Sequence, residues 1–248
     1  MKHEDAVCIG AWIAHKGRVT KEELQEHLRD EGLSSSSDLS PLIKQLIDEG
    51  QCFEHRDGIY LPMGKRILYR SGKVDSALET ALCELPMPVA LCPVSGYELN
   101  RFLSLQSFSP RIIVYAPKIV HDELASLLSS HGYQPIILRK GIVPYINDKT
   151  VFLSGLHWRT PLDRRGKRLY ASADRPLICA PTIEKLLIDC LAGDFGGDDA
   201  MLEEMFRNAL AQYAYNASAL ERYAKDRSKK ERLKNIVDRC GLAEEFYD

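Results

Sequence analysis

Three aspartates in the stretch DFGGDDA, residues 194–200, are the side chains best suited to metal-dependent chemistry. Grouped carboxylates hold the metal ions of phosphoryl-transfer enzymes, and the candidates here are Asp194, Asp198 and Asp199. An acidic, glycine-rich stretch between helices is more often an ordinary loop. In the second candidate turn, VSGYELN, only Glu98 follows the Ser-Gly step and no acidic pair is present. We therefore expect no catalytic residues, no metal and no cofactor, and keep an active nucleotidyltransferase as an alternative.

The stretch SSSSDLSPLIKQLIDEG, residues 34–50, contains side chains that could bind nucleic acid. Hydroxyl groups bind phosphate oxygens, while lysine and glutamine contact guanine and adenine in the major groove. If this stretch is a reading helix, its candidate DNA contacts are Ser36, Ser37, Ser40, Lys44 and Gln45. Contacts to the DNA backbone are expected from Arg56, Lys65, Arg66 and Arg70, with Lys73 nearby.

The charge of the first 62 residues argues against strong DNA binding. Seven lysines and arginines stand against twelve aspartates and glutamates, which leaves a net charge of −5. A DNA-binding surface is normally basic, because most of its affinity comes from neutralised phosphates. The charge therefore favours the alternative that this region contacts another protein and does not bind DNA.

The most concentrated positive charge lies in ALERYAKDRSKKERLKNIVDR, residues 219–239. Eight basic and four acidic residues give it a net charge of +4. Such a run is most often the solvated face of a helix. Two functional interpretations stay open, namely contacts to phosphates and a contact with an acidic surface of a partner protein. The candidate residues are Arg222, Lys225, Arg227, Lys229, Lys230, Arg232 and Lys234. Arg227 and Lys230 interrupt the apolar stripe, so the helix either exposes its middle or breaks near Ser228.

Three helices and a hairpin are predicted to position the candidate DNA-contacting residues. Thr20 and Glu23 predict a capping box, and Ser40-Pro41 predicts the start of the next helix. Asp57-Gly58 predicts a two-residue hairpin turn. This pattern predicts a winged helix-turn-helix domain over residues 1–62, followed by a basic linker over 63–76.

From residue 77 the sequence alternates between apolar strands and amphipathic helices, which predicts an α/β domain over 77–199. Capping boxes are expected at Ser95 with Glu98 and at Ser218 with Glu221, and Thr182 should cap TIEKLLIDCLAGD. The stretches KRLYAS and RPLICAP look like two further strands. Residues 200–248 read as a C-terminal helical segment, so the whole chain is expected to be α+β.

The composition is that of a globular protein of the reducing cytosol. The chain has 248 residues, 45 % of them hydrophobic, and no apolar run of about 20 residues that would span a membrane. Its seven cysteines are scattered and form no C-x-x-C pair. We therefore expect a cytoplasmic protein without a membrane partner, disulfides or a zinc site.

The order of these elements resembles the AbiEi-type antitoxins of type IV toxin–antitoxin systems and related bacterial winged-helix regulators. The stretches TIEKLLIDCLA and RYAKDR carry most of the resemblance, together with RIIVYAPK and SSHGY. The resemblance implies a winged helix followed by a domain of nucleotidyltransferase-like topology. It also implies a non-enzymatic transcriptional autoregulator with operator DNA and a separate nucleotidyltransferase toxin as its partners, and it leaves the oligomeric state undetermined.

Overall fold

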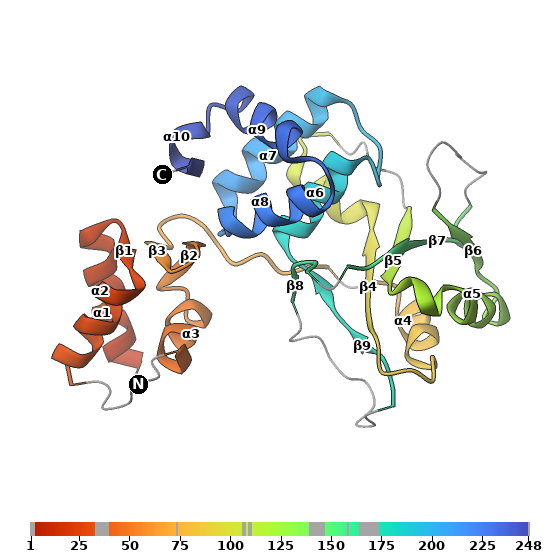
Figure 1. The fold of residues 1–248 in the computed structure, drawn as a ribbon, viewed down its shortest axis with the longest axis horizontal. Helices are drawn as coiled ribbons and strands as arrows, with labels where there is room; N and C mark the ends of the chain where they lie inside the picture. Colours follow the sequence, from red (N-terminus) through yellow and green to blue (C-terminus); the bar gives the residue numbers. More distant parts are fainter. Residues whose placement is uncertain are drawn as a thin grey trace.

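The N-terminal unit, residues 3–62, consists of three helices and a small antiparallel sheet (Figure 1). In this computed structural model the described residues are 3–32, 40–72, 74–105, 108, 111–138, 147–157, 159–163 and 174–247. The helices are α1 (His3–Lys16), α2 (Lys21–Asp30) and α3 (Ser40–Asp48). The sheet has the order β1 (Val19–Thr20), β3 (Ile59–Pro62) and β2 (Cys52–Arg56).

Local sequence signals explain where these elements begin and turn. The expected capping box forms at α2, where Thr20 N–H donates to Glu23 Oε2 over 2.8 Å and Glu23 N–H donates to Thr20 Oγ1 over 3.2 Å. The expected turn at Asp57-Gly58 also forms, and Gly58 adopts the left-handed conformation, with φ of +73°. Apolar side chains of all three helices and the sheet then share one core.

A five-stranded mixed sheet is the centre of the α/β body, which begins at α4 (Ser76–Cys83). The strand order is β6 (Gln134–Ile137), β7 (Thr150–Gly155), β5 (Ile112–Ala116), β4 (Ala90–Ser95) and β9 (Leu177–Ile178). Strands β5, β6 and β7 are parallel, β4 is antiparallel to β5, and β9 is parallel to β4. Two short strands, β8 (Leu162–Asp163) and β10 (Ala180–Pro181), form a separate antiparallel pair. The chain is therefore a mixed α and β protein, as expected.

The two faces of the sheet are covered by different helices, because successive strand residues point to opposite sides. Val114 and Ala116 of β5 belong to a core with α4 and α5 (His121–Ser130). Ile113 and Tyr115 belong to a second, larger core with α6 (Ile183–Ala192) and the helices that follow it. Two short 3₁₀ helices, η1 (Gly96–Phe102) and η2 (Lys118–Val120), follow β4 and β5.

The C-terminal helices share the second core and lie together beside α6 (Figure 1). They are α7 (Asp199–Gln212), α8 (Ala217–Asp226), α9 (Lys230–Arg239) and α10 (Ala243–Tyr247). Thr182 caps α6 as expected, and the helix anticipated over 219–239 breaks at Ser228, which has a positive φ of 57°. Within the described residues, no helix combines the length and the apolarity that crossing a membrane requires.

Two expected capping boxes do not form. Ser95 Oγ accepts a hydrogen bond from Tyr97 N–H over 3.3 Å, but Glu98 lies in a short 3₁₀ helix and turns toward donors of the 63–76 segment. Asn216, rather than Ser218, caps α8 by accepting from Ala219 N–H over 2.8 Å. The stretch RPLICAP divides into β9 and β10, which join different sheets, and the expected strand KRLYAS lies outside the described residues.

Candidate nucleic-acid interface

Helix α3 presents a small polar face to solvent. Ile43 and Leu46 pack into the N-terminal core, which leaves Ser40 and Lys44 exposed one turn apart. Gln45 is half-buried, and its amide donates a 2.6 Å hydrogen bond to Glu49 Oε1. The predicted contacts Ser36 and Ser37 lie outside the described residues. Lys44 is therefore the basic group that this face offers to a ligand, and the exposed carboxylate of Asp48 follows it one turn later.

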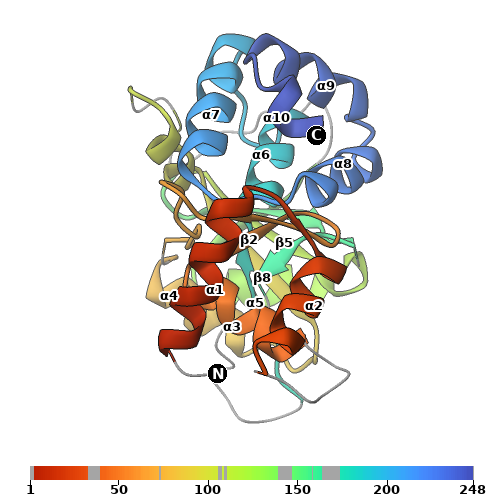
Figure 2. The ribbon, with the colours of Figure 1, turned by 90° about the vertical axis from the view of Figure 1, so that its left-hand side faces the viewer.

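The position of α3 brings it near the rest of the molecule. Viewed from the N-terminal side, α1 and α2 lie in front and α3 lies behind them, toward the α/β body (Figures 1 and 2). The segment that joins the two parts carries the exposed side chains of Lys65 and Arg70.

The β2–β3 hairpin docks onto the C-terminal helices. Arg56 donates a 2.6 Å hydrogen bond from Nη2 to the carbonyl oxygen of Phe246, and its Nη1 lies 3.4 Å from Glu221 Oε2. At the tip, Asp57 forms an ion pair with Arg222, and Asp57 N–H donates to Ser218 Oγ over 3.4 Å. Arg56, predicted to contact DNA, thus has its guanidinium group in the contact between the two parts of the chain.

Arg66 occupies the same contact. Its guanidinium pairs with Glu245, its Nε donates to the carbonyl oxygen of Leu210 over 3.2 Å, and it lies over the ring of Phe53 at 5.7 Å and of Tyr215 at 5.9 Å. Next to it, the buried His55 ring places Nε2 3.1 Å from the Glu245 carbonyl oxygen. Burial lowers the pKa of His55 below its ordinary value, against the opposing effect of this carbonyl. Lys65 and Arg70, unlike Arg66, remain on the surface.

The basic residues of 219–239 divide according to type. Each of the four arginines is used inside the chain: Arg222 pairs with Asp57, Arg227 with Asp189 and Asp194, Arg232 with Asp199, and Arg239 with Asp199 and Glu203. The side chains of the four lysines have no hydrogen-bond or ion-pair partner among the described residues, and three of the four are exposed while Lys229 is half-buried; they are Lys225, Lys229, Lys230 and Lys234. Of the predicted partner-binding set, the lysines are therefore the groups available to a ligand.

A buried polar network links α6, α8 and the sheet. Lys185 and Asp189, both fully buried and one turn apart on α6, form an ion pair, and Lys185 Nζ lies 3.0 Å from the centre of the Tyr115 ring. Asp189 Oδ1 accepts hydrogen bonds from Tyr223 Oη at 2.7 Å and from Arg227 Nη1 at 2.8 Å. Burial, with Asp189 beside it, raises the pKa of Tyr223 well above its ordinary range. The network therefore joins two stretches that lie far apart in the sequence, TIEKLLIDCLA and RYAKDR.

The three aspartates of DFGGDDA are all engaged by protein groups. Asp194 accepts from Arg227 Nη2 at 2.8 Å and from Tyr115 Oη at 2.9 Å. Asp198 caps α7 by accepting from Met201 N–H at 2.9 Å, and Asp199 pairs with Arg232 at 2.8 Å. Among the described residues, no group of three or more His, Cys, Asp and Glu side chains is arranged to hold a metal ion. These carboxylates therefore stabilise the helices around them.

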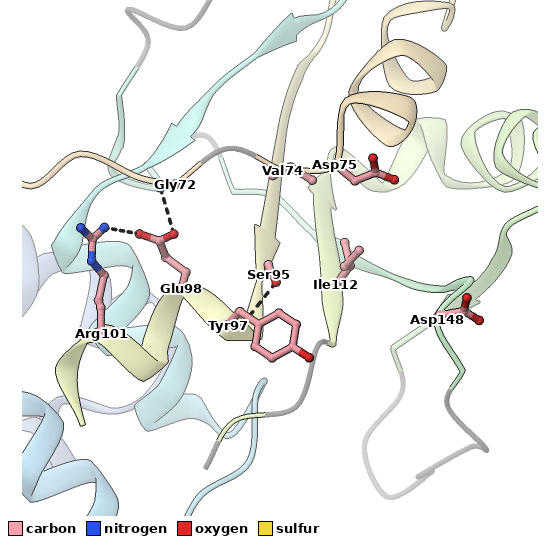
Figure 3. A pocket seen from close by; sticks show the side chains of 9 residues that line it. All are labelled: Gly72, Val74, Asp75, Ser95, Tyr97, Glu98, Arg101, Ile112 and Asp148. Atoms are coloured by element: carbon pink, nitrogen blue, oxygen red, sulfur yellow. Dashed lines mark hydrogen bonds and ion pairs between the residues drawn. The ribbon is translucent and has the colours of Figure 1, made fainter. Parts of the chain in front are cut away.

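The Ser95-Gly96 turn borders an open cleft of about 650 Å³ (Figure 3). On one side Glu98 accepts from Tyr69 Oη at 2.5 Å, from Gly72 N–H at 2.9 Å and from Arg101 Nη1 at 2.6 Å. Asp75 and Asp148 lie on the other side, away from this group (Figure 3). Glu98 therefore ties the 63–76 segment to η1, and no second carboxylate lies close to it among the described residues that line the cleft.

The buried network and the docking of the hairpin were not predicted from the sequence. The network has a recognisable signal, because Lys185 and Asp189 are four residues apart in a helix whose neighbours are apolar. A buried charge needs a partner, so this spacing indicates an internal ion pair. The docking has no such signal, since Arg56 and Phe246 are separated by 190 residues.

Comparison with known proteins places the chain in a family. No curated protein matches the sequence. One family model, described as a family of unknown function (DUF6577), matches residues 39–241. This match begins just before α3 and ends just after α9, so it includes the hairpin, the sheet and the buried network. The chain belongs to the DUF6577 family.

Proposed function

We propose that this protein is a DNA-binding transcriptional autoregulator, and a non-enzymatic antitoxin of the AbiEi type. In this proposal the N-terminal unit is a winged helix-turn-helix domain, with α3 as its reading helix and the β2–β3 hairpin as its wing. The α/β body is a domain of nucleotidyltransferase-like topology that has no catalytic role. The observation that carries the proposal is the exposed pair Ser40 and Lys44 on α3, opposite the side that forms the core.

Each DNA contact has a chemical reason. Lys44 donates to guanine acceptors in the major groove. The Gln45 amide, which donates one hydrogen bond to Glu49, contacts adenine with its remaining N–H and its carbonyl oxygen. Ser40 and the exposed Lys65 and Arg70 bind phosphate oxygens. Arg56 and Arg66 hold the hairpin on the C-terminal helices. In this proposal the phosphates are therefore bound by Ser40, Lys65 and Arg70.

The environment of the aspartates supports a non-enzymatic role. Metal-dependent nucleotidyl transfer needs carboxylates that are free to bind cations. Asp194 and Asp199 instead pair with arginines, and Asp198 caps a helix. The partners that this proposal implies are operator DNA and a separate nucleotidyltransferase toxin, with the cytoplasm as the site of action.

Substitution of Lys44 tests the proposal. We expect Lys44→Ala to lower the affinity for a duplex from the region upstream of the chain's own gene by about tenfold in a gel shift. The exposed Lys118 of η2 provides the matched control, because Lys118→Ala removes the same charge far from α3. Equal affinities of Lys44→Ala and the unaltered protein would contradict the proposal.

The second candidate function is a protein-interaction module that does not bind DNA. It is favoured by the net charge of −5 over residues 1–62. It is also favoured by the ion pairs that Arg56 and Arg66 form with glutamates of the C-terminal helices. Copurification with a partner protein, combined with gel shifts that show no binding to the upstream duplex, would support this function over the first.

A further inference from the structure

Two of the arginines that the sequence predicts as contacts to the DNA backbone are neutralised by carboxylates of the C-terminal helices. Arg56 lies 3.4 Å from Glu221 of α8, and Arg66 pairs with Glu245 of α10. The exposed fraction of the side chain is 18 % for Arg56 and 21 % for Arg66. A phosphate that approaches either guanidinium group therefore competes with a carboxylate, which also repels it.

A β-bulge directs two consecutive side chains of β2 into this contact. The pairing with β3 shifts register between Glu54 and Arg56, which makes His55 the extra residue. In a regular strand these neighbouring side chains would point to opposite faces. Here His55 Nε2 lies 3.1 Å from the carbonyl oxygen of Glu245, and Arg56 Nη2 donates to that of Phe246 over 2.6 Å. The bulge therefore shapes the hairpin to dock on α10.

A short segment joins the N-terminal unit to the body. The chain is fixed to the body from Ile67, whose N–H donates to the Gln212 carbonyl oxygen and whose carbonyl oxygen accepts from Ala214 N–H, each over 3.0 Å. Residues 63–66 lie between β3 and this anchor, and Gly64 among them has a positive φ of 57°. Because the N-terminal unit has a core of its own, it can turn as a rigid body about this segment once the hairpin leaves the C-terminal helices.

The hairpin contact buries two polar atoms that have no hydrogen-bond partner among the described residues. They are Nδ1 of His55 and Nε of Arg56. A buried polar atom without a partner costs the desolvation free energy of its group, which opposes docking. The rings of Phe53 and Tyr215, 6.5 Å apart, favour docking. These opposing effects bring the docked and released positions of the hairpin closer in free energy than the ion pairs alone would.

We propose that the docked hairpin is an autoinhibitory contact, and that full DNA binding requires its release from α8 and α10. Release makes Arg56 and Arg66 available to phosphates, in addition to Ser40, Lys65 and Arg70. The apparent affinity is then lowered according to the fraction of molecules in which the hairpin is docked. This inference rests on the proposed DNA binding by α3 and adds the regulation of that binding.

The double variant Glu221→Gln/Glu245→Gln removes the carboxylates that hold the two arginines. In fluorescence anisotropy, it should bind the duplex from upstream of the chain's own gene about tenfold more tightly than the unaltered protein does. The slope of log affinity against log salt should steepen by about two, because two more arginines neutralise phosphates. The matched control is Glu231→Gln/Glu244→Gln, which removes two exposed carboxylates that form no ion pair among the described residues. Its affinity should change by less than about twofold, since screened charges at a distance act weakly.

A quadruple variant separates release of the hairpin from the loss of negative charge. Arg56→Gln and Arg66→Gln, added to the double variant, should return the affinity and the salt slope to those of the unaltered protein. Hydrogen exchange in the unaltered protein gives an independent readout. In α10, Phe246 N–H donates to the Leu242 carbonyl oxygen over 2.9 Å. This amide should exchange faster when the upstream duplex is bound, because α10 loses its contacts with the hairpin.

The expected result is tighter binding by the double variant but not by the control variant, with faster exchange in α10 on DNA binding. The inference alone is overturned if the unaltered protein binds the upstream duplex and the double variant binds it no more tightly than the control variant. A quadruple variant that keeps the full gain, or exchange in α10 that the duplex does not change, also overturns it. Absence of binding by the unaltered protein and the double variant alike would overturn the proposed function together with this inference.

Discussion

Arg56 Nη2 donates a 2.6 Å hydrogen bond to the carbonyl oxygen of Phe246, and this bond joins the first part of the chain to its C-terminal helix. The same guanidinium group lies 3.4 Å from Glu221, while the neighbouring Arg66 pairs with Glu245. Arg56, a DNA contact expected from the sequence, is here a structural link. The N-terminal unit is therefore held against the rest of the protein by ionic and hydrogen-bonded contacts at one end of the hairpin.

Removal of this link should loosen the hairpin. Hydrogen bonds to charged groups contribute about 1.5–3 kcal/mol, so Arg56→Ala should speed amide hydrogen exchange in β2 and β3 by about tenfold or more. The exposed Arg18 is a matched control, and Arg18→Ala should leave the exchange rates unchanged. Unchanged protection of β2 and β3 in Arg56→Ala would show that this contact does not hold the two parts together.

The buried His55 predicts a dependence of stability on pH. Burial holds its pKa below the ordinary value of 6.5, so the folded protein keeps the ring neutral while the unfolded chain takes up a proton. The free energy of unfolding should therefore fall as the pH drops below about 6.5, by at most about 1.4 kcal/mol per pH unit from this group.

The variant His55→Gln isolates this contribution. Its neutral side chain does not titrate, so its stability should fall less steeply than that of the unaltered protein between about pH 7 and pH 5 in urea unfolding. Parallel curves for the two proteins would rule out His55 as the source of the pH dependence.

The buried network predicts a large loss of stability when one partner is removed. Asp189→Asn leaves the fully buried Lys185 without its counter-charge, and breaking such a pair costs about 3–5 kcal/mol. Asp226→Asn, an exposed substitution of the same kind on α8, should change the free energy of unfolding by no more than about 0.5 kcal/mol. A loss below about 1 kcal/mol for Asp189→Asn in urea unfolding would contradict the inferred role of this network.

The break between α8 and α9 predicts a stabilising substitution. Ser228 has a φ of +57°, a conformation that costs an L-residue about 1–2 kcal/mol but that glycine adopts freely. Because glycine also loses more entropy on folding, Ser228→Gly should raise the free energy of unfolding by about 0.5–1 kcal/mol. Ser228→Ala, which keeps the steric cost, provides the comparison. A destabilising effect of Ser228→Gly would mean that the serine hydroxyl contributes more than the backbone strain costs.

Local signals in the sequence predicted the elements whose ends depend on neighbouring residues. The Thr20–Glu23 capping box, the Asp57-Gly58 turn and the helix cap at Thr182 are all present. Each depends on groups within a few positions of one another, where residue type and spacing decide the geometry.

Longer-range contacts overrode the local pattern elsewhere. Glu98 was expected to cap its own helix, but Tyr69, Gly72 and Arg101 provide it with three donors. Ser218 was expected to cap α8, but it accepts from the Asp57 backbone at the hairpin tip. In the candidate site, too, only local features could be predicted. The exposure of Lys44 follows from helical spacing. The hydrogen bond of Arg56 depends on Phe246, a residue far along the chain.

The most direct test of the account is fluorescence anisotropy of the full chain with two labelled duplexes at low and moderate salt. One duplex comes from the region upstream of the chain's own gene, and the other is its scrambled counterpart. We expect tighter binding to the upstream duplex and a loss of affinity for both duplexes as salt rises, because lysine and arginine contacts to phosphates release counterions. Flat titrations on both duplexes would contradict it and leave α3 as a structural helix of an interaction module.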